Sequence, residues 1–159
     1  SLTHLDAEGR PRMVDVSEKA ATTRFAVAEG FIRTAEGTLT KLMSGGRKGD
    51  PLRVAEIAGI QAAKSTAELI PLCHMLPAVS VGVEVEADPS LPGLRARAFA
   101  RVQGSTGVEM EALTAVSVAL LTVYDMGKAI DRGMVIQDIR LIEKAGGRSG
   151  QWRASTQPK

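Results

Sequence analysis

Two adjacent runs of alternating residues constrain this chain more than any other feature, because together they predict a β-hairpin. Valine recurs at every second position over residues 79–85, and leucine or alanine does so over residues 94–100. A period of two is typical of strands that bury one face against a core. Asp88-Pro89-Ser90 and Pro92-Gly93 supply the turn between the runs. Arginine and glutamate residues between the apolar positions are expected to line the opposite face.

Longer apolar patterns flank the hairpin and predict helices and further strands. Asp50 followed by Pro51 is a helix-start signal, and Pro71 stops the helix that begins there. Gly107 precedes a second helical stretch, and Gly133 follows it. The expected elements are a strand over 24–34 with an irregularity at Gly30, a short helix over 36–43, helices over 52–70 and 108–130, and a last strand over 135–142.

The predicted order of the long elements is βαββαβ, which favours an α+β fold of the ferredoxin-like type. Such a fold packs its helices on one face of an antiparallel sheet. The other face then needs solvation by charged side chains or cover by a partner. The length of 159 residues fits a single domain over 1–159. We expect residues 1–20 to form a mobile N-terminal arm and residues 147–159 a flexible tail.

Composition excludes several classes of function. Aromatic residues make up 3% of the chain, too few for a platform that stacks single-stranded nucleic acid, and a net charge of +2 gives no broad field for a duplex. One cysteine and two histidines fall short of the four ligands usual for structural zinc. No apolar run approaches the roughly 20 residues of a membrane span. We therefore expect a cytoplasmic protein with no nucleic-acid partner, membrane segment or metal centre.

Two loops combine reactive side chains with glycine or proline. Arg47 and Lys48 lie between glycines, just before a helix N-terminus, where backbone amides and the helix dipole attract anions. The same loop also suits plain solvation, with Asp50 as the helix cap. Cys73 and His74 lie in an apolar loop between two prolines. A proton-carrying histidine and a buried structural histidine both fit this second loop.

Two further segments lie on the predicted long helix. Thr106–Thr114 places Glu109 and Glu111 at the helix start, where the dipole favours carboxylates. These residues are two apart and point to opposite sides, so at most one faces a site. Near the other end, Asp125 and Lys128 are three apart and share a face. In so apolar a helix we expect this pair to be partly buried and to serve acid/base chemistry, although a surface ion pair fits the spacing too.

Taken together, the motifs of the chain closely resemble one enzyme family. In order, they are Met13-Val14-Asp15-Val16, Gly59-Ile60-Gln61-Ala62-Ala63-Lys64, Leu69-Ile70-Pro71-Leu72-Cys73-His74, Thr106-Gly107-Val108-Glu109-Met110-Glu111-Ala112-Leu113-Thr114 and Tyr124-Asp125-Met126-Gly127-Lys128-Ala129. Over about Leu2 to Trp152 the chain resembles accessory protein C of molybdenum cofactor biosynthesis, the cyclic pyranopterin monophosphate synthase family. It departs from the family pattern at Gly45-Gly46-Arg47, Met75 and Gly127.

The resemblance implies that the single domain is catalytic and is a lyase. The family converts (8S)-3′,8-cyclo-7,8-dihydroguanosine 5′-triphosphate into cyclic pyranopterin monophosphate and releases diphosphate. The radical step lies upstream, so no cofactor is implied beyond Mg²⁺ that could accompany the triphosphate. The resemblance also implies a homohexamer, a trimer of dimers, whose active sites lie at subunit interfaces and take this small nucleotide-derived substrate.

The resemblance further assigns roles to single residues. Asp125, Lys128 and Lys48 match the catalytic positions of the family. The positions that match substrate contacts are Leu72, Cys73, His74, Met110, Glu111, Lys19 and Arg24. Lys64 joins this group on charge alone. We expect the two catalytic lysines to donate protons and to neutralise phosphates, while Asp125 sets their protonation or acts as a base.

The positions of Glu111 and Asp125 raise a geometric problem for a site within one chain. They are 14 residues apart in one predicted helix, so they lie about 21 Å apart along its axis. Two subunits that contribute opposite helix ends to one site would remove this problem. A different interpretation also stays open. A non-catalytic ferredoxin-like module that binds nucleotides for regulation would use Lys48 for phosphates and Asp125–Lys128 as a plain ion pair.

Overall fold

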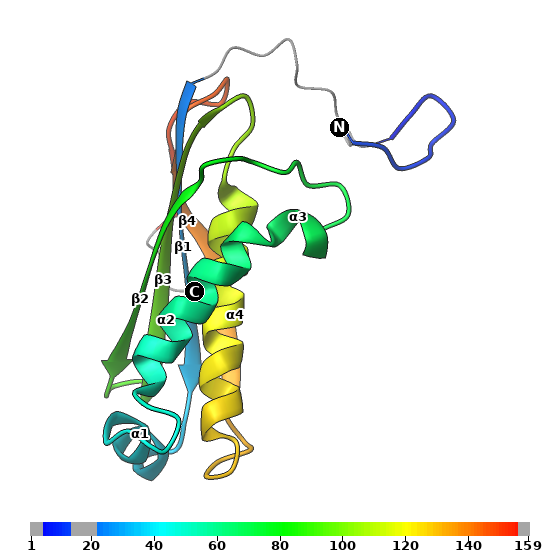
Figure 1. Cartoon of the computed structure of the whole chain (residues 1–159). Coiled ribbons are helices and arrows are strands. Elements are labelled where there is room, and N and C mark those ends of the chain that lie inside the picture. Colours follow the sequence, from blue (N-terminus) through cyan, green and yellow to red (C-terminus); the bar gives the residue numbers. More distant parts are fainter. Residues whose placement is uncertain (1–4, 14–21, 156–159) are drawn as a thin grey trace.

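The computed structural model describes residues 5–13 and 22–155, and it contains one antiparallel sheet with helices on one face. Strand order in the sheet is β2-β3-β1-β4-β5, and Figure 1 shows α2 and α4 lying over one sheet face. The elements are β1 (Thr22–Arg33), α1 (Glu36–Met43), α2 (Pro51–Lys64), α3 (Thr66–Leu69), β2 (Ser80–Asp88), β3 (Gly93–Gly104), α4 (Glu109–Gly127), β4 (Val135–Ala145) and β5 (Trp152–Arg153). The predicted α+β ferredoxin-like fold is confirmed.

The predicted hairpin is present as β2 and β3, which pair from Ser80 opposite Arg101 to Asp88 opposite Gly93. The alanines of β3 are fully or almost fully buried beneath the helices, whereas the arginines between them lie on the other face and keep partial exposure. The period of two therefore sets which face of the sheet receives α2 and α4.

Close helix packing depends on two glycines. A Cβ atom on Gly30 of β1 would lie 2.9 Å from side-chain carbons of Val116 and Leu120 in α4. The β1–β4 register also shifts at this glycine, as the predicted irregularity required. A Cβ atom on Gly59 of α2 would lie 2.8 Å from the carbonyl oxygen of Ala115 in α4. Because neither residue has a side chain, α4 can pack directly against both β1 and α2.

The helix expected over 52–70 is wrong in its length. Its start is confirmed, because Asp50 Oδ1 accepts a hydrogen bond of 3.0 Å from the Leu52 amide. The helix ends at Lys64, and the short α3 follows. The Ser65 amide donates to the Ala62 carbonyl at 3.0 Å, a tighter spacing that closes the helix, and Thr66 Oγ1 donates to the Ala63 carbonyl at 2.8 Å.

The helix expected over 108–130 is also shorter than predicted. α4 ends at Gly127, whose carbonyl accepts the amides of both Ile130 and Asp131. This tightening closes the helix before Gly133, the residue expected to end it. Among the described residues, α4 alone has the length and composition of a membrane-spanning helix. It is the central core helix here, because its residues from Ala112 to Val123 include many with no exposed surface.

The described part of the expected tail over 147–159 includes a short strand. Trp152 and Arg153 form β5 and pair with Lys144 and Glu143 of β4. The glycine-rich sequence before Trp152 gave no indication that this segment pairs with the edge of β4. The expected N-terminal arm lies outside the described residues apart from residues 5–13, where Asp6 accepts the Arg10 amide.

Candidate active site

The sequence-predicted site residues fall into two groups at opposite ends of α4. Figure 1 shows α1 and the loop after it beside the C-terminal end of α4, and α3 near the N-terminal end. One group comprises Lys48, Asp125 and Lys128. The other comprises Arg24, Lys64, Leu72, Cys73, His74, Met110 and Glu111. Lys19 lies outside the described residues. The predicted separation of Glu111 from Asp125 is confirmed, since α4 is continuous between them.

A tight turn presents the two cations of the first group. The Gly46 amide donates to the Gly49 carbonyl at 3.3 Å, and the Gly49 amide donates back at 3.0 Å. Arg47 and Lys48 are therefore the two central residues of a closed turn. Gly49 has a φ of 95°, a left-handed conformation that other residues adopt at a cost. All four residues are exposed, so the charges face solvent.

The Asp125–Lys128 pair lies on the last turn of α4. Lys128 Nζ donates to Asp125 Oδ1 at 2.6 Å, and their side chains are 56% and 57% exposed. The expectation of partial burial is therefore wrong within one chain. Most apolar residues of α4 face its packed sides, although Leu121 is exposed, and the last turn directs this pair outward. A hollow of about 200 Å³ lies beside it, between the Lys48 turn and the end of α4, with Met126 in its lining.

Mutual charge stabilises the ionised forms of this pair. The hydrogen bond from Lys128, with its charge, lowers the pKa of Asp125, and the charge of Lys48 lowers it further. The same bond and the Asp125 charge raise the pKa of Lys128. At neutral pH the aspartate is therefore a carboxylate and the lysine an ammonium. Lys48 and Met126 line the same hollow, so the turn and the end of α4 lie close together.

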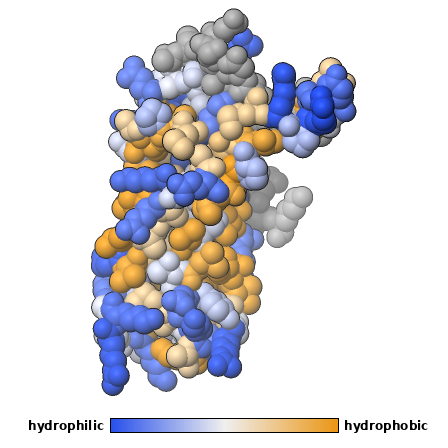
Figure 2. Space-filling view, turned by 45° about the vertical axis from the view of Figure 1, so that its right-hand side comes forward, coloured by the Kyte–Doolittle hydropathy of each residue, from blue (hydrophilic) through white to orange (hydrophobic). Residues whose placement is uncertain are grey.

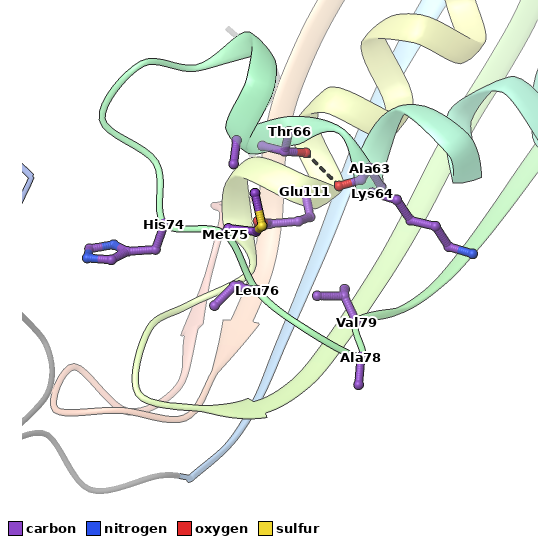
Figure 3. A pocket seen from close by; sticks show the side chains of 10 residues that line it. Ala63, Lys64, Thr66, His74, Met75, Leu76, Ala78, Val79 and Glu111 are labelled. Carbon is purple, nitrogen blue, oxygen red and sulfur yellow. Dashed lines mark hydrogen bonds between the residues drawn. The ribbon is translucent and has the colours of Figure 1, made fainter.

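Three residues of the second group, Lys64, His74 and Glu111, line a hollow of about 360 Å³ between the end of α2, the 74–79 segment and the start of α4. Figure 3 shows Glu111 at the centre, with His74 and Lys64 extending to opposite sides of it. Met75 and Thr66 complete the apolar and polar sides of the lining. The hollow is large enough for a heterocyclic ring and carries one carboxylate at its floor.

Glu111 is the most unusual polar residue of this hollow. Its side chain is buried, with 3% of the residue exposed. Its Oε2 atom is buried and has no hydrogen-bond partner among the described residues. Burial raises the pKa of Glu111, and the charge of Glu109 raises it further. A buried carboxyl oxygen without a partner is costly unless a ligand or another subunit completes it.

The neighbouring carboxylate behaves differently, as the helix spacing predicted. Glu109 Oε1 accepts a hydrogen bond of 3.0 Å from Lys144 of β4 and faces away from the hollow. Cys73 lies close enough for the negative charges of Glu111 and Glu109 to raise its pKa, after burial, which is the larger cause. A thiol held protonated is a poor nucleophile, so the cysteine has no activated form here.

Arg24 has a structural contact that the sequence did not reveal. Its Nε donates to the Gly104 carbonyl at 3.0 Å, near the loop that leads into α4. The guanidinium also lies over Gly147, where a Cβ atom would come within 2.2 Å of it. Arg24 thus links β3 to the segment after β4. A role in phosphate binding stays a prediction, as do the roles of Leu72 and Met110.

Sequence reasoning missed Thr66 and Lys144. Thr66 lines the hollow just after the end of α2, and its signal was the serine-threonine pair inside an otherwise helical run. Lys144 neutralises Glu109 from 35 residues further along the chain, which no local pattern could indicate. Within the described residues no cluster of three or more histidine, cysteine or carboxylate side chains has the arrangement of a metal site.

Comparison with known proteins places the chain in one group. Residues 13–147 match the model of the MoaC family. A cyclic pyranopterin monophosphate synthase from Methylobacterium sp. (strain 4-46) is 63% identical over 155 residues, which cover 97% of each chain. A protein of the same name from Brucella ovis is 57% identical over 155 residues, covering 97% of this chain and 94% of the relative. The matched range includes both groups of site residues.

Proposed function

This chain belongs to the MoaC family, and from this premise we propose that it is a lyase of molybdenum cofactor biosynthesis. Its substrate is (8S)-3′,8-cyclo-7,8-dihydroguanosine 5′-triphosphate, and its products are cyclic pyranopterin monophosphate and diphosphate. The observation that carries the proposal is the paired chemistry at the ends of α4. A charged Lys/Asp group suits phosphates, and a ring-sized hollow with a buried carboxyl suits the purine-derived part.

At the C-terminal end of α4, Lys128 and Lys48 are cations that neutralise the phosphates and donate protons. The Asp125 carboxylate accepts from Lys128 and so keeps that lysine in the ammonium form. The Lys128 ammonium can protonate a leaving group, and the neutral amine then takes up a proton from solvent. Developing negative charge on the diphosphate is stabilised by the same ammonium groups.

At the N-terminal end of α4, Glu111 binds the heterocycle. A purine-derived ring offers N–H groups, and a buried carboxyl oxygen without a partner accepts such a donor. His74 and Lys64 flank it on opposite sides, where they bind other polar edges of the same ligand (Figure 3). This arrangement gives orientation, which is needed before ring opening and closure can occur at defined atoms.

One active site combines the opposite ends of two α4 helices. Met110, Ser117, Leu121 and Lys128 lie along one line of the helix, because their spacings of 7, 4 and 7 residues return to the same side. Leu121 is 56% exposed on this line. An antiparallel second copy centred between Ser117 and Leu121 would bring Met110 of each helix beside Lys128 of the other.

Exposed apolar surface supports this association. Figure 2, turned so that the side carrying α4 comes forward, shows apolar side chains at the surface over the middle of the molecule. Ile57 of α2 and Leu121 of α4 are both more than half exposed. Contiguous apolar surface of this kind marks interaction sites. Three such dimers form the homohexamer, and the assembly works in the cytoplasm without a bound cofactor, with Mg²⁺ accompanying only the triphosphate.

Turnover tests the proposed reaction. The purified chain is incubated with the cyclised dihydro-GTP, and diphosphate and the cyclic monophosphate are quantified together. We expect equal amounts of both products, and no diphosphate from GTP, the matched control that lacks the 3′,8 bond. Binding of the substrate without diphosphate release would instead indicate the non-catalytic nucleotide-binding module.

A further inference from the structure

Asp131, just after α4, makes hydrogen bonds that the proposed reaction does not use. Its Oδ2 accepts the Ala35 amide and the Thr38 hydroxyl, each at 3.1 Å. Its Oδ1 accepts the Gly133 amide at 2.9 Å. Ala35 is the N-cap residue of α1 and precedes Asp131 by 96 positions. From the far end of α4, the carboxylate therefore accepts the N-cap amide of α1, as the acidic residue of a capping box does, and the hydroxyl of Thr38 in the first turn.

This cap fixes the start of a short helix. α1 has eight residues, and a helix of that length is marginal by itself. Its first amides need acceptors, and a negative charge at this end is favoured by the helix dipole. Asp131 accepts one of these amides, that of Ala35, and places a negative charge at this end. Its own position is fixed, because its amide donates to the Gly127 carbonyl at 3.0 Å and Tyr124 Oη donates to the Arg132 carbonyl at 2.9 Å.

The other end of α1 contacts the same part of α4. A Cβ atom on Gly127 would lie 3.4 Å from Leu42 Cδ2, so the last turn of α1 packs closely against the last residue of α4. The chain then continues from α1 into the Gly45–Asp50 loop, which holds Lys48. Both ends of α1 are thus held by residues 127–131, directly after Asp125.

We propose that Asp131 is a positioning residue that holds α1, and through it the Lys48 turn, against the end of α4 that carries Asp125 and Lys128. Two elements far apart in the sequence each supply part of this charged group, and Asp131 is the side chain that hydrogen-bonds across them. The proposal rests on the proposed function for its kinetic consequence, but its geometric content can be measured without turnover.

A merely structural cap and a positioning residue differ in one measurable respect. A structural cap lowers stability and leaves the Lys48 turn in place beside Asp125. Loss of a positioning residue moves the Lys48 turn away from Asp125, so the charge of Lys48 no longer lowers the pKa of the Asp125 carboxyl group. The influence can be measured in the full-length protein by ¹³C NMR titration of labelled aspartate carboxyl carbons, with and without Lys48→Ala.

In the wild-type background we expect Lys48→Ala to raise the pKa of Asp125, because the Lys48 charge lowers it. In the Asp131→Ala background the same substitution should leave that pKa unchanged. Glu36→Ala is the matched control, since it removes a negative charge from the first turn of α1 without touching the Asp131 hydrogen bonds. An equal Lys48 effect in the Asp131→Ala and Glu36→Ala backgrounds would overturn the proposal.

Kinetics gives a second readout. Asp131→Ala should reduce kcat by about 10-fold or more, as a small misplacement of reacting groups does, with KM little changed. Asp131→Asn keeps one carbonyl acceptor and should restore part of the loss. A kcat equal to that of Glu36→Ala would contradict the positioning role.

If Asp131→Ala does not fold, Asp131→Asn and Thr38→Val take its place in the NMR cycle. An undiminished effect of Lys48→Ala on the Asp125 pKa in both variants would overturn the proposal. A wild-type protein without turnover would refute the proposed reaction, and the NMR cycle would still decide the role of Asp131.

Discussion

Lys128 Nζ donates a hydrogen bond of 2.6 Å to Asp125 Oδ1 across one turn of α4, and both side chains remain more than half exposed. An exposed ion pair contributes little to stability because water and salt screen it. Its charges nevertheless lower the pKa of Asp125 and raise the pKa of Lys128. The pair is therefore better suited to chemistry than to holding the fold together.

Lys128→Ala should abolish turnover and leave the fold intact. The ammonium group is lost from the proposed proton donor, whereas an exposed pair adds little to folding. Diphosphate release and the urea midpoint of unfolding measure the two effects. Arg95→Ala is the matched control, because it breaks another solvent-exposed ion pair, with Glu86 of the neighbouring strand β2. Near-normal turnover by folded Lys128→Ala would remove this lysine from the mechanism.

The pKa of Asp125 should respond more to Lys128 than to Lys48. The hydrogen bond from Lys128 is the largest cause of the lowered pKa, and the Lys48 charge is the smallest. Because the folded pKa is depressed, the stabilisation exists above the ordinary aspartate pKa and is lost as pH falls through the folded value. Carboxyl ¹³C titration of Lys128→Ala and Lys48→Ala compares the two. A larger rise with Lys48→Ala would contradict the geometry of the pair.

Glu111→Gln should stabilise the protein while it impairs activity. Burial raises the pKa of Glu111, so the folded protein favours the neutral carboxyl group. The stability of the fold therefore decreases as pH rises from the ordinary glutamate pKa through the raised value of the folded state. At pH 8 the unfolding free energy of Glu111→Gln should exceed that of wild type by about 1 kcal/mol. The difference should shrink as pH falls.

Glu109→Gln is the control for this comparison, because Glu109 is paired with Lys144. It should leave stability unchanged or lower it. Denaturant titrations of the three proteins across pH supply the measurement. A wild type that is more stable than Glu111→Gln at every pH would show that the carboxylate is already satisfied.

Gly30→Ala should destabilise the fold by about 1–3 kcal/mol, the usual cost of overpacking a core. The new methyl group would lie 2.9 Å from side-chain carbons of Val116 and Leu120. Gly37→Ala on α1 is the control, since a Cβ atom there meets nothing within 4 Å. That change should be neutral or stabilising, because alanine favours helix. Equal denaturation midpoints for both variants would contradict the packing of α4 on β1.

The regular spacing of apolar residues along the sequence explains why much of the fold was predictable. The alternation over 79–85 and 94–100 identifies both strands of the hairpin and their buried faces. Helix ends were harder to predict, since α2 stops at Lys64, where the Ser65 amide donates to the Ala62 carbonyl, rather than at Pro71. The choice between these two ends depends on three-dimensional context and leaves no periodic trace.

The site was predictable in part for the same reason. Helical rise alone separates Glu111 from Asp125, and spacing alone turns Glu109 away from Glu111. Exposure of the Asp125 pair was not predictable, because it depends on which elements cover the last turn of α4. The contact of Asp131 with Ala35 spans 96 positions and likewise has no local signature.

Subunit complementation tests the shared active site most directly. Glu111→Ala and Asp125→Ala are each inactive if both groups serve the reaction. In a mixed dimer one of the two sites lacks both groups, and the other has both intact. Free exchange at equal amounts should therefore restore about one quarter of wild-type diphosphate release, since half of the dimers are mixed. A mixture of Asp125→Ala with Lys128→Ala is the control, because both changes affect the same helix end and no pairing restores it.

Diphosphate release by verified mixed oligomers is the decisive measurement. The shared site predicts recovery with Glu111→Ala plus Asp125→Ala and none with the control mixture. Mixed oligomers of folded subunits that remain inactive in both mixtures would contradict it, and would mean that Glu111 and Asp125 serve the reaction from within one chain.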